Sequence, residues 1–520
     1  MQIEPDFETF RAEYEAGRAQ VLWARAPADL DTPVSLLLKL AQAGPESFLL
    51  ESVTGAAARG RYSIIGWKPD LVWRCFGDRA EINRAAAYDP EAFLPDETEG
   101  GALASLRAVL AESAIALPES LPSAAAGLFG YLGYDMIRLV ERLPEPNPDP
   151  LGAPDALMLR PSLTAVIDNA FDTVTLVAPA RPREGLSGRE AYNRAAERIS
   201  DALADLDRPI PSARDLDGAA AAKADLKPKS NTPKAKYKRM VETAKEYIAA
   251  GDIFQVVLSH RWRFPFAPPP LALYRALRRT NPSPYMFYFN FSMGGAPFQI
   301  AGASPEILVS VSGRDPAAKP GERIVTIRPI AGTRVRGANE AEDQALEAEL
   351  LADPKERAEH LMLLDLGRND VGRVAEIGSV DPNEQFTVER YSHVMHIVSN
   401  VRGVLREEHD ALSALLAGLP AGTVSGAPKI RAMEIIDELE VEKRGVYAGG
   451  VGYFSANGDM DTCIALRTAV IKDGHVYVQA GGGVVADSTP EGEFQETVNK
   501  AKAVIRAAEE AGRFASRGNR

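Results

Sequence analysis

The segment HVYVQAGGGVVADSTPEGEFQETVNKA, residues 475–501, sets the pattern for the second half of the chain. Its first six residues alternate as in a strand, three glycines follow, and Ser488-Thr489-Pro490-Glu491 is a typical helix start. The helix is predicted to run from about Thr489 to Gly512, which places Glu493 and Glu496 one turn apart on one face. The segment therefore combines glycine N–H groups, which can bind a small carboxylate, with two carboxylates.

Outward from this segment, helices and strands alternate back to a helix that begins after Thr232-Pro233 and ends at Gly251. Upstream, strands are predicted at 21–27, 48–53 and 60–67, with a hairpin turn at Gly77-Asp78 and another hairpin within 163–179. A polar stretch at 205–233 is the predicted linker between these two parts. DTCIALRTAVI (461–471) is predicted to be one continuous buried strand.

Composition narrows the class of protein. The 520 residues are 45% hydrophobic and 25% charged, which is typical of a globular protein, and the net charge is −13. An acidic chain has no overall attraction to nucleic acid or to an anionic membrane surface, and no apolar run is long enough to span a bilayer. The two cysteines exclude a disulfide framework, and no apolar signal core is present. We therefore expect a cytoplasmic protein that binds neither nucleic acid nor membrane.

A second carboxylate pair lies in DPKERAEH, residues 353–360. Asp353-Pro354 predicts a helix start, and Glu356 and Glu359 then share a face at a spacing of three. Two ExxE pairs supply the hard oxygen ligands that Mg²⁺ prefers. Either pair alone is also common on a solvated helix, so this spacing leaves both interpretations open.

Two further residues are candidates for chemistry. His396 lies in a predicted strand, where a histidine is either a hydrogen-bonded core residue or a general acid or base. Arg467 lies in the buried-looking strand 461–471, where its charge needs a structural carboxylate or an anionic ligand. The glycine-rich segments lack the spacing of nucleotide-binding loops, because neither GxxxxGK[ST] nor a helix-opening GxGxxG is present.

Taken together, the motifs resemble the large, chorismate-binding subunit (component I) of anthranilate synthase. The resemblance spans about 40–510 and is densest at 234–505. The segments that carry it are LLESV, GRYSIIG, GYLGYDMIR, GDIFQVVLS, NPSPYMFY, ASPEILV, PIAGTRVRG, DPKERAEHLMLLDLGRND, HIVSNVRG, LPAGTVSGAPKIRAMEII, RGVYAGGVGYF, DTCIALRTAV and AGGGVVADSTPEGEFQETVNKA.

The resemblance implies an α+β fold, in which a large β-sandwich of mostly antiparallel sheets is flanked by helices. It also implies an N-terminal regulatory region at 1–204 with tryptophan-site elements, the linker at 205–233, and a chorismate-binding catalytic region at 234–520. The family further suggests that strands of the two regions pack together.

The implied activity is Mg²⁺-dependent conversion of chorismate and ammonia to anthranilate and pyruvate. The implied metal ligands are Glu359 and Glu496, with Glu356 and Glu493 beside them through water or as acid/base groups. The positions that match the family's other catalytic residues are His396, Thr423 and Glu306. The positions that match its chorismate-binding residues are Gly332, Thr333, Tyr447, Arg467, Gly481, Gly482 and Gly483.

One position separates this family from the related aminodeoxychorismate synthases, which often carry a nucleophilic lysine in a PIKGT motif. Here Ala331 occupies that position, so ammonia is the expected nucleophile. Val335 and Gly482 depart slightly from the usual family residues, and Gly482 adds backbone freedom to the glycine run. A non-catalytic tryptophan sensor with the same fold is the alternative of another class, and the intact catalytic positions argue against it.

The resemblance also implies a partner and a regulator. Neither cysteine lies in the GxCxGxQ-like motif of a glutamine amidotransferase, so a separate amidotransferase subunit is expected to supply ammonia. Feedback inhibition by tryptophan is implied by elements at Glu51, Ser52, Asn281, Pro284, Tyr285 and Met286.

Overall fold

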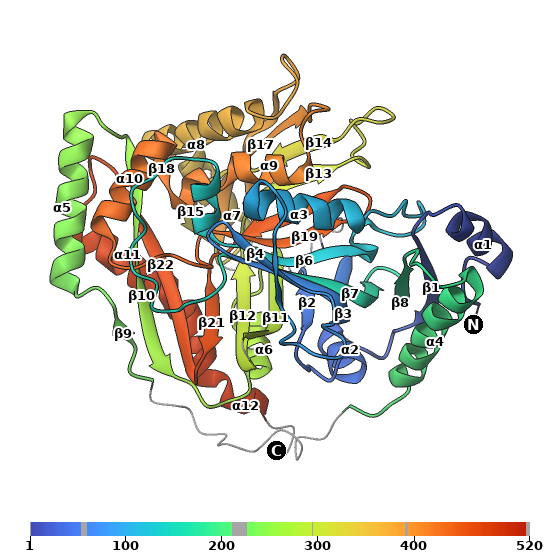
Figure 1. The fold of residues 1–520 in the computed structure, drawn as a ribbon. Helices are drawn as coiled ribbons and strands as arrows, with labels where there is room; N and C mark the ends of the chain where they lie inside the picture. The colour runs from blue at the N-terminus through green and yellow to red at the C-terminus, as the bar shows by residue number, and fades with distance from the viewer. Residues whose placement is uncertain (1, 54–59, 211–225, 294, 391–393, 516–520) are drawn as a thin grey trace.

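The computed structural model describes residues 2–53, 60–210, 226–293, 295–390 and 394–515, and Figure 1 shows its fold. Most of the predicted linker, 211–225, lies outside these residues. The described strands pair antiparallel throughout, in one continuous hydrogen-bonded network that folds into two layers. No helix among the described residues is long and apolar enough to cross a membrane.

The first layer is a row of strands that draws on both ends of the chain. In spatial order it contains β1 (Gln20–Pro27), β8 (Thr173–Ala180), β7 (Ala156–Asp168), β3 (Tyr62–Phe76), β2 (Ser47–Glu51), β11 (Tyr285–Met293), β12 (Ala296–Ser304), β21 (Thr468–Lys472), β22 (His475–Val484), β10 (Gln255–Pro265) and the short β9 (Lys229–Ser230). The β2–β11 pairing joins the N-terminal and C-terminal regions in one sheet, as the family resemblance suggests.

The second layer also combines both regions. It runs from β7 through β6 (Gly127–Leu132), β19 (Gly450–Ser455), β20 (Met460–Ile464), β13 (Ile307–Ser312) and β14 (Ile324–Ile327) to β17 (Val394–Val404), which also pairs with β15 (Ile330–Val335) and β16 (Asp381–Arg390). The small strands β4 (Arg79–Asn83) and β5 (Leu94–Asp96) extend β3, and β18 (Gly426–Ala427) pairs with the start of β10.

The long strands β3 and β7 connect the two layers. Their pairing shifts register between Pro69 and Leu71, so Asp70 is the extra residue of a bulge. Lys68, two residues before Asp70, has a positive φ of 51°, and Pro161 lies opposite Pro69. A bulge bends and twists a strand pair locally, which allows the two strands to leave one layer and continue in the other.

An apolar cluster between the layers defines the sandwich. It is rich in aromatic side chains, with Phe48, Phe129, Phe287, Phe289 and Phe298 all fully buried. The predicted α+β sandwich is therefore confirmed, and its core is built from strands of both sequence regions.

Helices cover the outer faces. Against the first layer pack α1 (Phe7–Glu15), α2 (Pro33–Leu40), α4 (Gly188–Leu206), α6 (Pro270–Thr280), α11 (Pro490–Glu510) and α12 (Gly512–Ala515). A second apolar core contains side chains of α3 (Gly101–Glu112), α5 (Lys234–Ala250), α8 (Pro354–Gly372), α9 (Ala411–Gly418) and α10 (Lys429–Leu439). The helix α7 (Glu340–Ala352) precedes α8. Figure 1 shows α1 and α4 together at one end of the molecule and α5, α10 and α11 at the other.

Candidate active site

Of the predicted catalytic, substrate-binding and metal-binding residues, His396, Arg467 and Glu496 line a cavity of about 650 Å³ beside α11. Its lining includes His396 of β17, Arg467, and Glu496 and Lys500 of α11. The loop 281–284 after α6 closes another side. Gly332 and Thr333 contact this lining through His396, and Gly481 contacts it through Lys500. Glu306 and Thr423 line a separate small pocket.

The two ExxE pairs lie on helices, as the spacing predicts. At the start of α8 the carboxylate of Asp353 accepts hydrogen bonds from the backbone N–H groups of Lys355 and Glu356. At the start of α11 the Thr489 hydroxyl accepts one from Gly492, and Pro490 occupies the first turn. Both helix starts therefore fix the direction in which their glutamates project.

The carboxylates of the two helices are close enough to affect one another. Burial raises the pKa of Glu359, and the negative charges of Glu356 and Glu496 raise it further. Burial likewise raises the pKa of Glu493, again with a contribution from the charge of Glu496. The fold thus holds like charges together, which favours a positively charged ligand between them.

Two cations already contact this cluster. Lys500 lies 2.7 Å from a carboxylate oxygen of Glu496 and donates a 3.0 Å hydrogen bond to the carbonyl of Gly481, and Arg334 lies 3.2 Å from Glu356. Within the described ranges, no group of three or more acidic, histidine or cysteine side chains is arranged to hold a metal ion. Glu359 and Glu496 nevertheless suit Mg²⁺ chemically, since that ion often takes only one or two carboxylates and completes its shell with water and substrate oxygens.

A bulge in β15 fixes the position of His396. The β15–β17 register shifts between Ala331 and Thr333, so Gly332 is the extra residue, with a φ of +72°. Nδ1 of His396 lies 3.0 Å from the Gly332 carbonyl and 3.0 Å from the Thr333 hydroxyl. Because a carbonyl can only accept, Nδ1 carries the proton in that bond, and the neutral ring has its lone pair on Nε2. Burial lowers the pKa of His396, and the positive charge of Arg467 adds to this, which favours the neutral base.

The buried Glu306 and the half-buried Thr423 form a hydrogen-bonded pair that lines a small pocket of its own. The Thr423 hydroxyl, in a single 3₁₀ turn (Gly422–Val424), donates a 3.0 Å hydrogen bond to a carboxyl oxygen of Glu306. Burial raises the pKa of Glu306 to about 8. At neutral pH this residue is therefore a protonated acid.

The glycine run 481–483 lies inside strand β22, paired with β10, and not in a loop. A Cβ at Gly481 would lie 2.9 Å from the Tyr447 hydroxyl, one at Gly482 would lie 2.8 Å from a carboxyl oxygen of Glu493, and one at Gly483 would lie 2.7 Å from the side-chain amide of Gln255. None of the three has a positive φ. The expectation that Gly482 supplies backbone freedom is therefore wrong; these glycines allow polar side chains to approach the strand closely.

Arg467 does not lie within a continuous strand. The predicted strand 461–471 breaks into β20 and β21, and Arg467 occupies the break with a φ of +47°. Burial lowers its pKa, and in the part of the chain that the structure describes its guanidinium has no hydrogen bond or ion pair. A cation held in a cavity without a carboxylate partner is poised for an anionic ligand.

Two residues of this site were not predicted. Lys500 was detectable as the i+4 partner of Glu496 on the same helix face. Gln255 lies in the quoted GDIFQVVLS segment, but its chemistry depends on burial: its amide oxygen is buried with no hydrogen-bond partner among the described residues. Strand alternation alone gives no signal of this kind.

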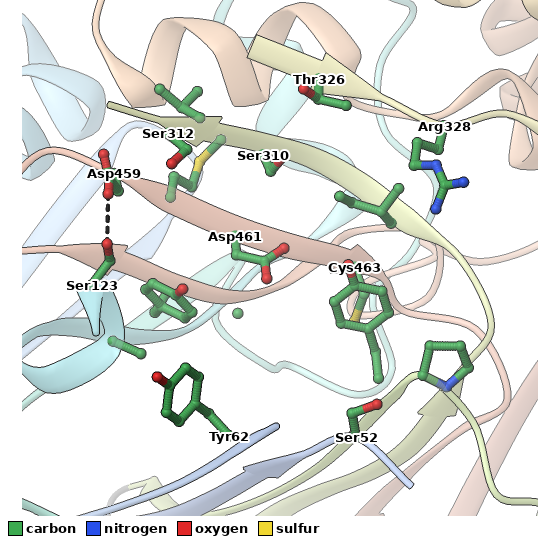
Figure 2. A pocket seen from close by; sticks show the side chains of 18 of the residues that line it. Ser52, Tyr62, Ser123, Ser310, Ser312, Thr326, Arg328, Asp459, Asp461 and Cys463 are labelled. Atoms are coloured by element: carbon green, nitrogen blue, oxygen red, sulfur yellow. Dashed lines mark hydrogen bonds between the residues drawn. The ribbon is translucent and has the colours of Figure 1, made fainter. Parts of the chain in front are cut away.

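A second cavity of about 780 Å³ lies between the two layers. Figure 2 shows Ser52, Tyr62, Asp461 and Cys463 around it. Of the predicted tryptophan elements, Glu51, Ser52, Pro284, Tyr285 and Met286 contribute to its lining.

Two of these elements have other contacts. The carboxylate of Glu51 bonds to Tyr274 and, at 2.6 and 3.0 Å, to Arg278, both on α6. Asn281 lines the catalytic cavity and not this one. Pro284 and Pro305 line both cavities, so they form a shared wall.

Comparisons with known proteins agree with this geometry. A family model described as chorismate binding enzyme matches residues 55–506, so the chain belongs to the chorismate-binding enzymes. A protein of Cereibacter sphaeroides described as anthranilate synthase component 1 is 64% identical over 98% of this chain and 99% of its own length. Another of that description, from Pseudomonas aeruginosa, is 49% identical over 92% of this chain and 93% of its own length. Within that class, the chain is an enzyme of the anthranilate synthase component 1 family.

Solved structures lead to the same fold. Anthranilate synthase component I from Streptococcus pneumoniae TIGR4 superposes with a TM-score of 0.72 at 38% identity, covering 88% of this chain and 94% of that one. The menaquinone-specific isochorismate synthase of Escherichia coli gives a TM-score of 0.68 at 20% identity, covering 97% and 100%, which supports the fold alone.

Proposed function

We propose that this enzyme converts chorismate and ammonia to anthranilate and pyruvate. In the first step ammonia forms a bond to ring carbon 2, the ring hydroxyl leaves as water, and one ammonia proton is released in exchange for the proton that the hydroxyl takes up. In the second step the enolpyruvyl oxygen leaves ring carbon 3, the proton on carbon 2 is removed, and pyruvate and aromatic anthranilate result.

The observation that carries this proposal is the buried Glu306, which accepts a hydrogen bond from Thr423 in a small pocket of its own and directly follows Pro305, a lining residue of the cavity that contains His396 and Arg467. Its raised pKa favours the protonated acid at neutral pH. A protonated carboxylic acid can give its proton to the leaving hydroxyl. In the larger cavity, neutral His396 is suited to take the ring proton in the second step. The site thus contains an acid and a base whose surroundings shift their pKa values in the useful directions.

Substrate charge is matched locally. Chorismate is a dianion and the chain carries a net charge of −13, so attraction must come from cations inside the cavity. Arg467 and Lys500 line it and supply two. The amide oxygen of Gln255, buried without a partner in the described ranges, gives an acceptor for an N–H of ammonia.

Mg²⁺ is proposed as the cofactor, with Glu359 and Glu496 as the residues that would hold it. When bound, the ion would neutralise substrate carboxylate charge beside these helices. Burial raises the pKa of Glu359, and repulsion by Glu356 and Glu496 raises it further; such an ion would relieve that repulsion.

Ammonia is proposed to come from a separate glutamine amidotransferase subunit, in keeping with the "component 1" description of the relatives. Both cysteines of this chain are buried, and burial raises the pKa of each thiol, which removes the thiolate that glutamine hydrolysis needs. Free ammonia is expected to replace the partner in vitro.

Tryptophan is proposed as a feedback inhibitor that occupies the cavity between the layers. Tyr285 and Met286 offer apolar contacts for an indole, and the hydroxyl of Ser52 is buried without a partner among the described residues. Because Pro284 and Pro305 also line the catalytic cavity, a ligand that moves this wall would change the chorismate site.

The test is to incubate the purified chain with chorismate, ammonium and Mg²⁺ at mildly alkaline pH and to identify products by mass. Anthranilate with an equal amount of pyruvate is expected. An amino adduct without pyruvate would instead indicate aminodeoxychorismate synthase chemistry. No consumption of chorismate, with or without an amidotransferase, would leave a non-catalytic tryptophan sensor.

A further inference from the structure

The loop after α10 contains a buried ion pair that touches three parts of the catalytic site. Arg444 and Glu440 have side chains that are 1% and 3% exposed, and they lie 2.6 Å apart in a two-pronged contact. Neither residue lines the catalytic cavity. Removing two charges from water is costly unless further hydrogen bonds satisfy them, so the partners of this pair indicate what it does.

The first connection is to the turn that carries Thr423. Nη1 of Arg444 donates a 2.7 Å hydrogen bond to the carbonyl of Val424, the residue directly after Thr423. The turn, Gly422–Val424, is short and has two backbone hydrogen bonds of its own, from Val424 to Ala421 at 3.1 Å and from Ser425 to Gly422 at 3.2 Å. Arg444 therefore fixes one end of the peptide segment that aims Thr423 at Glu306.

The second connection is to strand β10, which pairs with the glycine run. Arg444 donates a 2.7 Å hydrogen bond to the carbonyl of Val257, and Glu440 accepts from the backbone N–H and hydroxyl of Ser259 at 2.7 and 2.9 Å. Val257 and Ser259 lie opposite Gly483 and Gly481 in the ladder. On the side of β10 away from β22, β18 pairs only with 255–256 and β9 only with 262–263. The carbonyl of Val257 and the N–H of Ser259 lie between these pairings, so the ion pair supplies the hydrogen bonds that no strand supplies there.

The third connection is to Tyr447. The guanidinium of Arg444 lies 5.6 Å from the centre of the Tyr447 ring and 4.8 Å from that of Tyr134. The Tyr447 hydroxyl in turn reaches the glycine run at Gly481.

We infer that Arg444 is a positioning residue for the chorismate site, which, with Glu440, sets the relative placement of Thr423, Tyr447 and the strand at Gly481–Gly483. Its planar fork of donors is needed because it serves a carboxylate and two carbonyls at once, which the single ammonium of lysine cannot do. The inference rests on chorismate as the substrate of the proposed function.

The experiment compares Arg444→Lys with Arg160→Lys in the full chain. Arg160 is a matched control, since it is equally buried and bonds Asp70, Glu112 and Ser113, but in the bulge between β3 and β7. Both variants should lose thermal stability. Only Arg444→Lys should lose kcat/KM, by on the order of 100-fold, because small misplacements of binding groups have effects of this size.

A second readout separates positioning from activity. Chorismate affinity is measured by calorimetry without ammonia, and it should fall in Arg444→Lys but not in Arg160→Lys. If Arg444→Lys does not fold, Glu440→Gln takes its place, because the amide keeps an acceptor for Ser259 while its hydrogen bonds to Arg444 become weaker. In that variant kcat/KM and chorismate affinity should each fall by about tenfold. Equal kcat/KM and chorismate affinity in both variants, once corrected for stability, would overturn the inference. A wild-type chain that binds chorismate without turnover would contradict the proposed function alone.

Discussion

The two cavities differ in how they treat charge. In the cavity between the layers, the cationic side chains are paired: Arg61 with Asp168 at 2.8 Å, Arg328 with Glu389 at 2.6 Å, and Arg402 with Asp381 at 3.1 Å. In the catalytic cavity, Lys500 is paired with Glu496 at 2.7 Å, but Arg467 has no such partner within the described part of the chain. A buried arginine that is already paired with a carboxylate has a structural role, whereas a buried arginine without a carboxylate partner beside a cavity can take its counter-charge from a bound anionic ligand. This difference supports the proposal that the catalytic cavity binds the chorismate dianion and that the cavity between the layers binds tryptophan, which has no net charge.

The strongest test of this difference is Glu496→Gln in the catalytic cavity. The change keeps the size of the side chain and removes the charge, so Mg²⁺-dependent turnover should fall by on the order of 1,000-fold or more. Anthranilate fluorescence at several Mg²⁺ concentrations measures it, and circular dichroism should show an intact fold. Glu491→Gln on the same helix is the control, since Glu491 pairs with exposed Lys234. Full activity in Glu496→Gln would remove this residue from the proposed metal ligands.

The next effect in size concerns the two classes of arginine. Arg467→Lys keeps the charge but loses the planar fork that binds a carboxylate, so kcat/KM for chorismate should fall by about 100-fold, mainly through KM. Arg61→Lys, at the paired arginine of the other cavity, should leave kcat/KM unchanged. Steady-state kinetics on both variants decides the matter. If the two substitutions had equal effects, the distinction between paired and unpaired cations would fail.

Glu306 predicts a pH dependence that belongs to the catalytic cavity alone. As a proton donor with a pKa of about 8, it should make kcat/KM fall as the pH rises through that value. Its effect on stability has the same sign. Because the folded pKa lies above the unfolded value of 4.5, its contribution is fully present below 4.5 and is lost as the pH rises toward 8.

The matching variant is Glu306→Gln, which cannot donate that proton and cannot ionise. It should reduce turnover, remove the decline around pH 8 and flatten the stability profile between 4.5 and 8. Rate and thermal melting are measured over pH 5 to 9. A decline at pH 8 that persisted in the variant would assign it to another group.

Much of this comparison was accessible from the sequence, because local patterns determine it. Asp353-Pro354 and Thr489-Pro490 fix the starts of α8 and α11, and a spacing of three then places each glutamate pair on one face. Family motifs supplied the remaining positions around the catalytic cavity. Strand pairings between distant segments could not be predicted from local patterns. β2 pairs with β11 more than two hundred residues away, and a bulge at Asp70 allows β3 to belong to both layers.

The errors have a common cause. Arg467 is expected within a continuous strand, but it occupies a break with a left-handed backbone conformation. Gly482 is expected to add backbone freedom, but the close approach of Glu493 explains why glycine is needed there. Both depend on what packs against the residue, which hydropathy and spacing do not encode. The same holds for Arg444, whose four hydrogen bonds join segments far apart in the chain.

The smallest expected effect tests whether the two cavities act separately. Ser52→Phe fills the cavity between the layers, so it should weaken inhibition by tryptophan by about tenfold or more, equivalent to about 1.4 kcal/mol of binding, while kcat and KM stay unchanged. Asn281→Ala is the converse variant, since Asn281 lines only the catalytic cavity; it should raise KM for chorismate and leave the intrinsic affinity for tryptophan as it was. Inhibition curves at fixed chorismate, together with tryptophan binding by calorimetry, distinguish the two. Unchanged inhibition in Ser52→Phe would count against this cavity as the tryptophan site. Loss of turnover in the same variant would mean that the shared wall at Pro284 and Pro305 couples the cavities more rigidly than their separate linings suggest.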